Sequence, residues 1–323
     1  MWFGPLLSFA TSPLAVVSRS AAARSTPRPA RGQPCPVLQL ITDVLVKIGH
    51  EDSRHHEFER HRHLSRETLI DVRSFDDLVA EAVAADLTGW DFGWLDGRAS
   101  EERPPWGYAK RLAARLPQVR SALDIDTGGG EVLVEAPRFP PRMVATESWP
   151  PNAQRARELL GPRGVHVIET VEGASLPLPD ESFELVSARH PVAPDWAEIH
   201  RVLAPGGCYF AQHVGPASAY ELIEYFVGPL PREPIGRDPH REAAAAQQAG
   251  LVVTDLRRAR CRMEFYDVGA VVWILRKCVW WVPGFSVDKY LDTLGELDQQ
   301  MRQGRPVVAH STRHLIEAQR PVR

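Results

Sequence analysis

From residue 74 onwards, short apolar runs alternate with amphipathic segments. Apolar residues spaced three and four apart follow Ser74, so we expect a helix there with Ser74 as its N-cap and Asp77 at its third position. Later apolar runs predict strands at Ala122–Asp126, Met143–Glu147, Val165–Glu169, Phe183–Ala188 and Cys208–His213. Helical stretches separate them at 129–135, 151–160 and 195–203. This alternation is typical of parallel strands joined by crossover helices.

The same pattern continues to the end of the chain. It predicts helices near 217–227 and 240–249, and strands near 252–258 and 312–318. We therefore expect an α/β fold for residues 74–323: a Rossmann-like, doubly wound, mostly parallel sheet of seven strands with helices on both faces. A helical insertion is expected near 268–304.

Residues 1–73 are expected to be a disordered or poorly structured extension. Segment 18–36 is rich in Ser, Arg, Ala and Pro, a composition that cannot bury a core. The apolar stretch before it has no positive charge ahead of Arg19, which disfavours a signal peptide without excluding one. This extension also contains a cluster of histidines among charged residues: His50, His55, His56, His61 and His63. The cluster lacks the apolar shell that holds metal ligands in place, so we favour a solvated segment over a metal site. No metal is predicted.

Composition narrows the range of functions. The net charge of −3 gives no bulk attraction to nucleic acid. The four cysteines are scattered, with neither disulfide nor zinc spacing, which suits a reducing compartment. No run of eighteen apolar residues is present, so no membrane segment is expected. We expect a cytoplasmic protein, and its oligomeric state stays open.

The most informative residues follow the first predicted strand of the sheet. Asp124 ends an apolar run, and glycines at Gly128 and Gly130 would let a ligand approach the backbone. A dinucleotide fingerprint needs a third glycine where Leu133 stands, and no phosphate-binding loop is present. Acids also end or follow the next two strands, Glu147 and Glu172. Together they favour a nucleoside ligand without phosphates.

These motifs resemble those of class I S-adenosylmethionine-dependent methyltransferases, of the methyltransferase type 11 kind. Residues 122–130 (ALDIDTGGG) resemble the first motif of that family, and 199–207 (IHRVLAPGG) resemble its later turn. Segment 176–186 (LPLPDESFELV) resembles its approach to the fourth strand. The resemblance covers about 74–320 and implies S-adenosyl-L-methionine as cofactor.

The resemblance also implies roles for single residues. Asp124 would lie near the methionine end of the cofactor, Glu147 would bind the ribose, and Glu172 would lie beside the adenine. Gly128 and Gly130 would form the turn against the cofactor. Asp126 stands where the family has its first glycine; an aspartate tolerates unusual backbone angles but adds a charge to the cofactor site.

For catalysis we expect a general base at the end of the fourth strand. His190 is the candidate, the adjacent Arg189 could hold an acidic substrate, and His213 is a weaker candidate. Aromatic residues around 105–108 could form a lid over the site or cap the core. A small-molecule methyl acceptor is favoured. An RNA methyltransferase and a non-catalytic cofactor-binding module stay open as alternatives.

Overall fold

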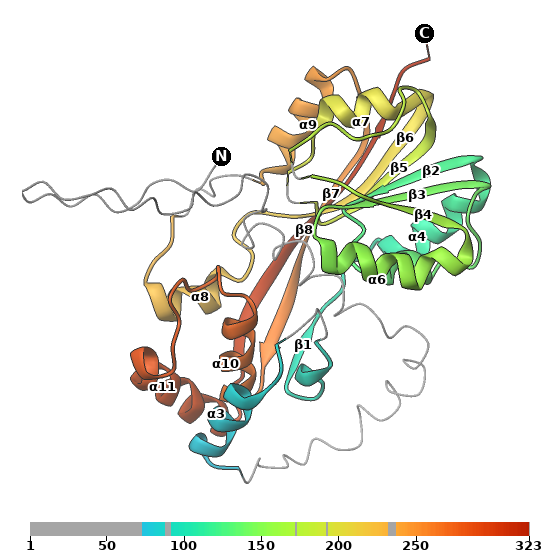
Figure 1. Cartoon of the computed structure of the whole chain (residues 1–323). Helices are drawn as coiled ribbons and strands as arrows, with labels where there is room; N and C mark the ends of the chain where they lie inside the picture. Colours follow the sequence, from blue (N-terminus) through green and yellow to red (C-terminus); the bar gives the residue numbers. More distant parts are fainter. Residues whose placement is uncertain (1–72, 88–91, 172, 192, 232–236, 323) are drawn as a thin grey trace, which may run out of the picture. The chain divides into compact units, whose positions relative to one another are not determined.

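The computed structural model describes residues 73–87, 92–171, 173–191, 193–231 and 237–322. The predicted extension, its histidine cluster and Glu172 therefore lie outside the described residues, apart from Arg73. Within the described ranges, eight strands form one sheet in the order β1-β7-β8-β6-β5-β2-β3-β4 (Figure 1).

Five strands make up the parallel half of this sheet. They are β2 (Ser121–Ile125), β3 (Arg142–Glu147), β4 (Val165–Glu169), β5 (Phe183–Arg189) and β6 (Leu203–Val214). β2 pairs in parallel with β3 on one side and with β5 on the other. The chain thus proceeds outward from β2 in both directions. In open α/β sheets, ligands bind at the carboxyl ends of the strands beside such a reversal.

Helices cover both faces of the parallel half (Figure 1). One face carries α4 (Tyr108–Arg115), α5 (Glu131–Val134) and α6 (Pro150–Leu160), and the other carries α7 (Trp196–Val202) and α9 (Pro239–Gln248). Successive residues of β2 point to opposite faces: Ala122 packs in the core under α6, while Leu123 packs in the core under α7. The predicted doubly wound α/β fold is confirmed.

β7 (Val252–Phe265) and β8 (Val307–Gln319) are antiparallel neighbours and longer than the predicted 252–258 and 312–318. In the added part of β7, the buried residues Cys261, Met263 and Phe265 alternate with arginines and glutamate. This is the period-two pattern of a half-covered strand. The density of arginine conceals it in the sequence.

The eighth strand, absent from the predicted seven, is β1 (Ala99–Glu101). It pairs antiparallel with the outer end of β7, where Ala99 faces Phe265. A three-residue strand of mostly polar residues carries no hydrophobic pattern, and only its pairing with β7 defines it.

A second group of helices packs at the outer ends of β7 and β8. It contains α3 (Phe75–Ala84), α8 (Tyr220–Val227), α10 (Val268–Lys277) and α11 (Leu291–Arg302). α10 and α11 occupy the range in which a helical insertion is expected. α3 begins as predicted, because Ser74 and Asp77 form a reciprocal capping box. The described residues also include short 3-10 helices at Gly93–Leu95, Leu116–Gln118, Gly161–Arg163 and Asp288–Tyr290.

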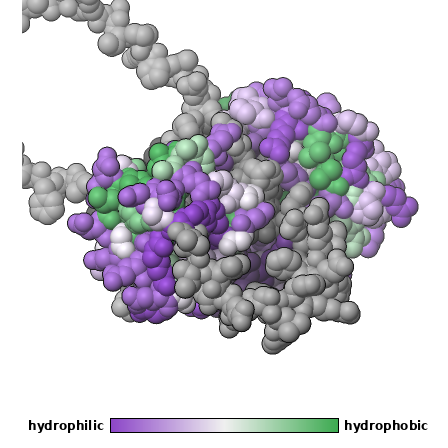
Figure 2. All heavy atoms as spheres, turned by 90° about the horizontal axis from the view of Figure 1, so that it is seen from below, coloured by the Kyte–Doolittle hydropathy of each residue, from purple (hydrophilic) through white to green (hydrophobic). Residues whose placement is uncertain are grey.

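The surface mixes polar residues with isolated apolar ones. On the face in Figure 2, hydrophobic residues form separate patches between hydrophilic ones. Large exposed apolar side chains come from elements far apart in the chain, for example Val83, Tyr225 and Val279. None of the helices among the described residues combines the length and the apolar character needed to cross a membrane.

Candidate functional site

Asp124 lies near the end of the central strand β2 and is buried. Its Oδ1 accepts a hydrogen bond of 2.5 Å from Oγ of Ser187, the residue directly opposite on β5. Burial raises the pKa of Asp124 to about 6, although the hydrogen bond from Ser187 acts in the other direction. The carboxyl group of Asp124 therefore titrates close to neutral pH.

Asp126 has a left-handed backbone conformation, with φ of 54°. This is the region that glycine occupies without cost and that aspartate tolerates better than most residues. The position thus keeps the conformation that a glycine would give it, and the substitution adds only a side chain and a charge. That charge contributes to raising the pKa values of Asp124 and Glu147.

The glycines of the turn serve two different purposes. Gly128 and Gly130 both have positive φ, 64° and 87°. A Cβ on Gly130 would lie 2.7 Å from Cδ1 of Leu160 on α6, so this glycine lets α5 pack against α6. The backbone N–H of Gly128, in contrast, points at a side chain of the neighbouring strand.

That side chain is Glu147, which ends β3 and is fully buried. Its Oε2 accepts the N–H of Gly128 at 2.8 Å, and its Oε1 accepts the N–H of Trp149 at 2.9 Å. Burial raises the pKa of Glu147, and the charge of Asp126 adds to this. The structure thus brings Glu147 to the glycine turn. Both residues lie at the carboxyl edge of the sheet, as does Asp124.

His190 immediately follows β5, is fully buried and has a left-handed backbone with φ of 61°. Its Nε2 lies 2.9 Å from Nε2 of Gln212 on β6, and Oε1 of Gln212 accepts the indole N–H of Trp106 at 2.7 Å. An indole nitrogen only donates, so the amide of Gln212 must turn its NH₂ group toward His190. Nε2 of His190 is therefore an acceptor.

It follows that His190 is neutral and carries its proton on Nδ1. This Nδ1 atom is buried and has no hydrogen-bond partner among the described residues. Burial, and then the charges of Arg189 and Arg313, hold the pKa of His190 well below its usual value. The arrangement presents an N–H donor. Acceptance of a proton at Nε2 would require the amide of Gln212 to move.

Arg189 is the last residue of β5. Burial lowers its pKa to about 10, so it is still a cation at neutral pH. Two aromatic residues around the start of α4 lie at this end of the sheet. Trp106 and Tyr108 are buried, and the hydroxyl of Tyr108 donates to the carbonyl of Ala188 at 3.1 Å. These contacts favour the core-capping interpretation of these aromatics over a lid.

Sequence reasoning missed two partners in this site, Ser187 and Gln212. Ser187 could have been found from strand register alone, since it faces Asp124 once β2 and β5 are paired. Gln212 carries no signal, because its role depends on Trp106, more than a hundred residues away. The predicted roles of the seven described candidates, and that of Glu172, stay predictions.

Residues 123–211 match the family model described as a methyltransferase domain. This range extends from β2 into β6 and contains Asp124, the glycine turn, Glu147 and His190. The part of the chain that carries the candidate site thus matches a methyltransferase domain, which supports the resemblance to class I methyltransferases that the sequence motifs indicate. A search of curated protein sequences found no match.

Solved structures similar to this chain include a putative methyltransferase from Bacillus halodurans C-125, with 18% identity over 66% of this chain and 97% of that chain, at a TM-score of 0.47. The YcgJ protein from Bacillus subtilis has 15% identity over 66% and 98%, also at 0.47. A possible histamine N-methyltransferase from Thermotoga maritima has 16% identity over 66% and 86%, at 0.38. Because the identities are below 25% and the TM-scores below 0.5, we draw no conclusion about the methyl acceptor from these similarities.

Proposed function

We propose that this chain transfers a methyl group from S-adenosyl-L-methionine to a small-molecule acceptor. The observation that carries the proposal is the buried carboxylate of Glu147, which accepts the backbone N–H of Gly128 at 2.8 Å. This contact joins the end of β3 to the glycine turn after β2. It lies at the edge where open α/β sheets bind nucleosides.

The charges of the site suit a cationic cofactor. Asp126 raises the pKa values of Asp124 and Glu147, in addition to the larger effect of burial. S-adenosylmethionine carries positive charge on its sulfonium and amino groups, and a bound cation would relieve the repulsion between these carboxylates. A dinucleotide, whose phosphates are negative, would increase it.

The hydrogen-bonding capacity of the site also suits the ribose. Each carboxylate oxygen of Glu147 accepts one backbone N–H from the glycine turn or from Trp149. We propose that ribose hydroxyls would also hydrogen-bond to this carboxylate, since a carboxylate can accept several hydrogen bonds. Gly128 and Gly130 would hold the turn against the cofactor, and Asp124 would lie near its amino-acid end. Glu172 is proposed to lie beside the adenine.

When bound, the cofactor would supply a methyl group on a cationic sulfur; a nucleophile of the acceptor would bond to that methyl carbon as the carbon–sulfur bond breaks and a neutral thioether leaves. The chain's own residues would orient the acceptor. We propose that His190 donates a hydrogen bond to it through Nδ1–H, and that Arg189 holds an acidic group of the acceptor. The general-base role expected of His190 would need Nε2 to be released by Gln212.

Two alternatives are separated from this proposal by experiment. An RNA methyltransferase would bind RNA with an affinity that falls steeply with salt. A non-catalytic module would bind the cofactor and transfer nothing. The left-handed backbone of Asp126 is compatible with cofactor binding in both cases, so only transfer of the methyl group separates the proposal from the second alternative.

Calorimetry with S-adenosylmethionine provides the first test. We expect the wild type to bind, and Glu147→Ala and Gly128→Val to lose binding with their circular dichroism unchanged. Glu169→Ala is the matched control, because Glu169 ends the neighbouring strand β4 with an exposed side chain and should leave the affinity unaltered. A folded wild type that binds no cofactor would contradict the proposal.

The second test follows the methyl group. The protein is incubated with radiolabelled cofactor and a cell extract, which is then separated into small molecules, RNA and protein. We expect label in the small-molecule fraction. Label in RNA supports the RNA alternative instead, and cofactor binding without any transferred label supports the non-catalytic module.

A further inference from the structure

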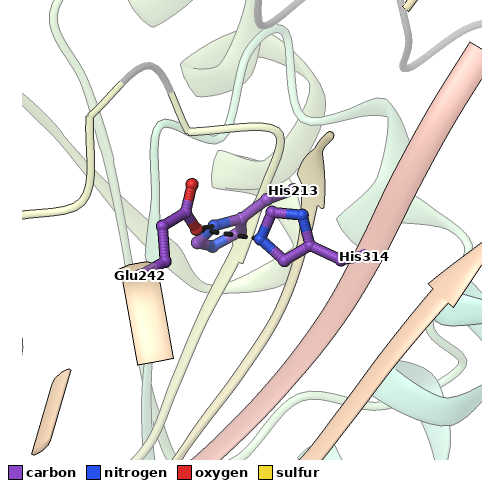
Figure 3. Close-up of side chains that lie close together, drawn as sticks. All are labelled: His213, Glu242 and His314. Atoms are coloured by element: carbon purple, nitrogen blue, oxygen red, sulfur yellow. Dashed lines mark hydrogen bonds and ion pairs between the residues drawn. The ribbon is translucent and has the colours of Figure 1, made fainter. Parts of the chain in front are cut away.

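Three side chains that the proposed function does not use meet beside β6. His213 on β6 and His314 on β8 lie directly opposite each other in the antiparallel register, and Glu242 extends toward both from α9 (Figure 3). Oε2 of Glu242 lies 2.5 Å from Nδ1 of His213 and 2.8 Å from Nε2 of His314. Single ligand atoms from all three residues lie within 4.8 Å of one another.

We propose that His213, Glu242 and His314 bind one divalent transition-metal ion of the zinc and iron class. Two imidazoles and one carboxylate form the donor set of many catalytic zinc sites and of non-haem iron sites. Metal–ligand bonds of about 2.0–2.2 Å place the ligand atoms roughly 3–3.5 Å apart. The hydrogen-bonded atoms therefore need to separate by less than about 1 Å to admit the ion.

The proton position of His213 is compatible with this exchange, whereas in His314 the proton would move to Nδ1, which is buried and has no hydrogen-bond partner among the described residues. A carboxylate only accepts, so the nitrogens that face Glu242 carry hydrogen in the structure. On metal binding each imidazole keeps one proton, which moves to its other nitrogen. For His213 that nitrogen is Nε2, which lies 3.0 Å from the hydroxyl of Tyr209. A hydroxyl can donate to Nε2 before the exchange and accept from it afterwards.

The surroundings hold the two histidines in place. His213 and His314 are 2% and 1% exposed, and the rings of Trp196 and Tyr209 pack around His213. A metal ligand fixed by a hydrogen bond and an apolar shell is pre-oriented for binding. Arg237 is a nearby cation whose charge lowers the pKa of His213, and it weakens the attraction for a dication. We therefore expect the Arg237 charge to reduce the affinity for the ion.

The site also adjoins the candidate active site. His213 directly follows Gln212, the partner of His190, in β6. The charge of His213 also acts on His190. Because consecutive residues of a strand point to opposite faces of the sheet, His213 faces the layer of α7 and α9, where Trp196 contacts it, and Gln212 faces the other layer. The metal proposal does not depend on methyl transfer, since it is tested without the cofactor.

The alternative to a metal site is a purely structural role. In that case Glu242 ties α9 to the sheet through two hydrogen bonds, and no ion displaces them. The two cases differ in metal content and in the response of thermal stability to metal, because a ligand that binds only the folded state raises the melting temperature.

The experiment uses the full chain without an affinity tag, stripped with a chelator and then equilibrated with Co²⁺, Zn²⁺ or, anaerobically, Fe²⁺. We expect about one ion per chain by mass spectrometry, visible absorption bands with Co²⁺, and a raised melting temperature. Comparison of the three ions shows which metal the site prefers. Glu242→Ala and His314→Ala are expected to lose the ion, the absorption and the metal-induced shift.

Two control variants locate the ion. His310 also contacts a glutamate, Glu221, at 2.9 Å, but belongs to no three-ligand group among the described residues, so His310→Ala should keep the metal. A variant with glutamine at His50, His55, His56, His61 and His63 should also keep it. The proposal would be overturned if the wild type bound no ion. It would also be overturned if the Glu242→Ala variant kept the ion while the variant with all five of these histidines replaced lost it.

Discussion

The side-chain amide of Gln212 donates a hydrogen bond to Nε2 of His190 across 2.9 Å. Since Trp106 fixes the orientation of that amide, the contact determines both the charge and the tautomer of the histidine. The residue expected from the sequence to be a base is thus held as a neutral donor. Its chemistry is set by two residues that no sequence motif indicates.

The first prediction is therefore spectroscopic. Burial and the surrounding charges of Arg189, Arg313, His213 and Arg237 keep the pKa of His190 well below its usual value. We expect nitrogen-15 NMR to show a neutral Nδ1–H tautomer for His190 from about pH 5.5 to about pH 8. Such a histidine destabilises the fold as the pH falls below about 6.5, because only the unfolded chain takes up the proton readily.

The matched variant for this prediction is Gln212→Glu. A carboxylate there can accept but not donate, so it should move the proton of His190 to Nε2 or charge the ring. Circular dichroism checks that the variant folds. If His190 of the wild type titrates near its usual value, the hydrogen-bond assignment made here is wrong.

A second prediction concerns the backbone of Asp126. Its φ of 54° costs an aspartate free energy that glycine does not pay. We expect Asp126→Gly to raise the free energy of unfolding by about 1 kcal/mol, as measured by urea denaturation. Asp126→Asn separates the two effects of the residue, because it removes the charge and keeps a Cβ in the left-handed region. If Asp126→Asn raised the free energy of unfolding as much as Asp126→Gly does, the effect would come from the charge and not from the backbone.

A third prediction concerns Gly130, which has φ of 87° and lies against Leu160. A Cβ would meet Cδ1 of Leu160 at 2.7 Å, so Gly130→Ala combines backbone strain with a steric clash. We expect a loss of about 2–3 kcal/mol in the free energy of unfolding. Gly161→Ala is the control, since Gly161 has ordinary helical angles and open space around it. Equal effects of the two substitutions would contradict the packing argument.

Local patterns predicted much of this protein. Apolar runs located the five parallel strands to within a residue or two at most ends, apart from β6, which begins five residues before its predicted start. The position of Glu147 beside Gly128 follows from topology, because parallel strands end at one edge of the sheet. The long strand β7 was only half predicted. Its buried positions become visible only when β8 supplies the partner.

The side-chain networks could not be predicted for a different reason. His213 and His314 are neighbours because β6 and β8 pair in one particular register, and a shift of one residue would place them on opposite faces. Glu242 joins them from a helix whose placement depends on packing. A metal motif with close spacing can be recognised in a sequence, whereas ligands so far apart along the chain are assembled only by the fold.

The last prediction links pH, stability and cofactor binding through Asp124. Burial raises its pKa to about 6, against the hydrogen bond from Ser187, and the charge of Asp126 adds to the rise. A cationic cofactor prefers the ionised carboxylate, so its binding should release a proton near this pH. We expect the affinity for S-adenosylmethionine, measured by calorimetry, to fall as the pH decreases below about 6. Glu147, whose pKa burial also raises, should contribute to the same fall.

Asp124→Asn isolates the contribution of this one residue. An acid whose pKa is raised in the folded state stabilises the fold most at low pH, and its contribution declines as the pH rises through the folded-state pKa. The asparagine variant removes that decline, so at neutral pH we expect a free energy of unfolding higher by about 3 kcal/mol together with weaker cofactor binding. This opposite change in stability and affinity distinguishes a functional acid from a structural one. A variant that loses stability at neutral pH would show that the charge of Asp124 supports the fold.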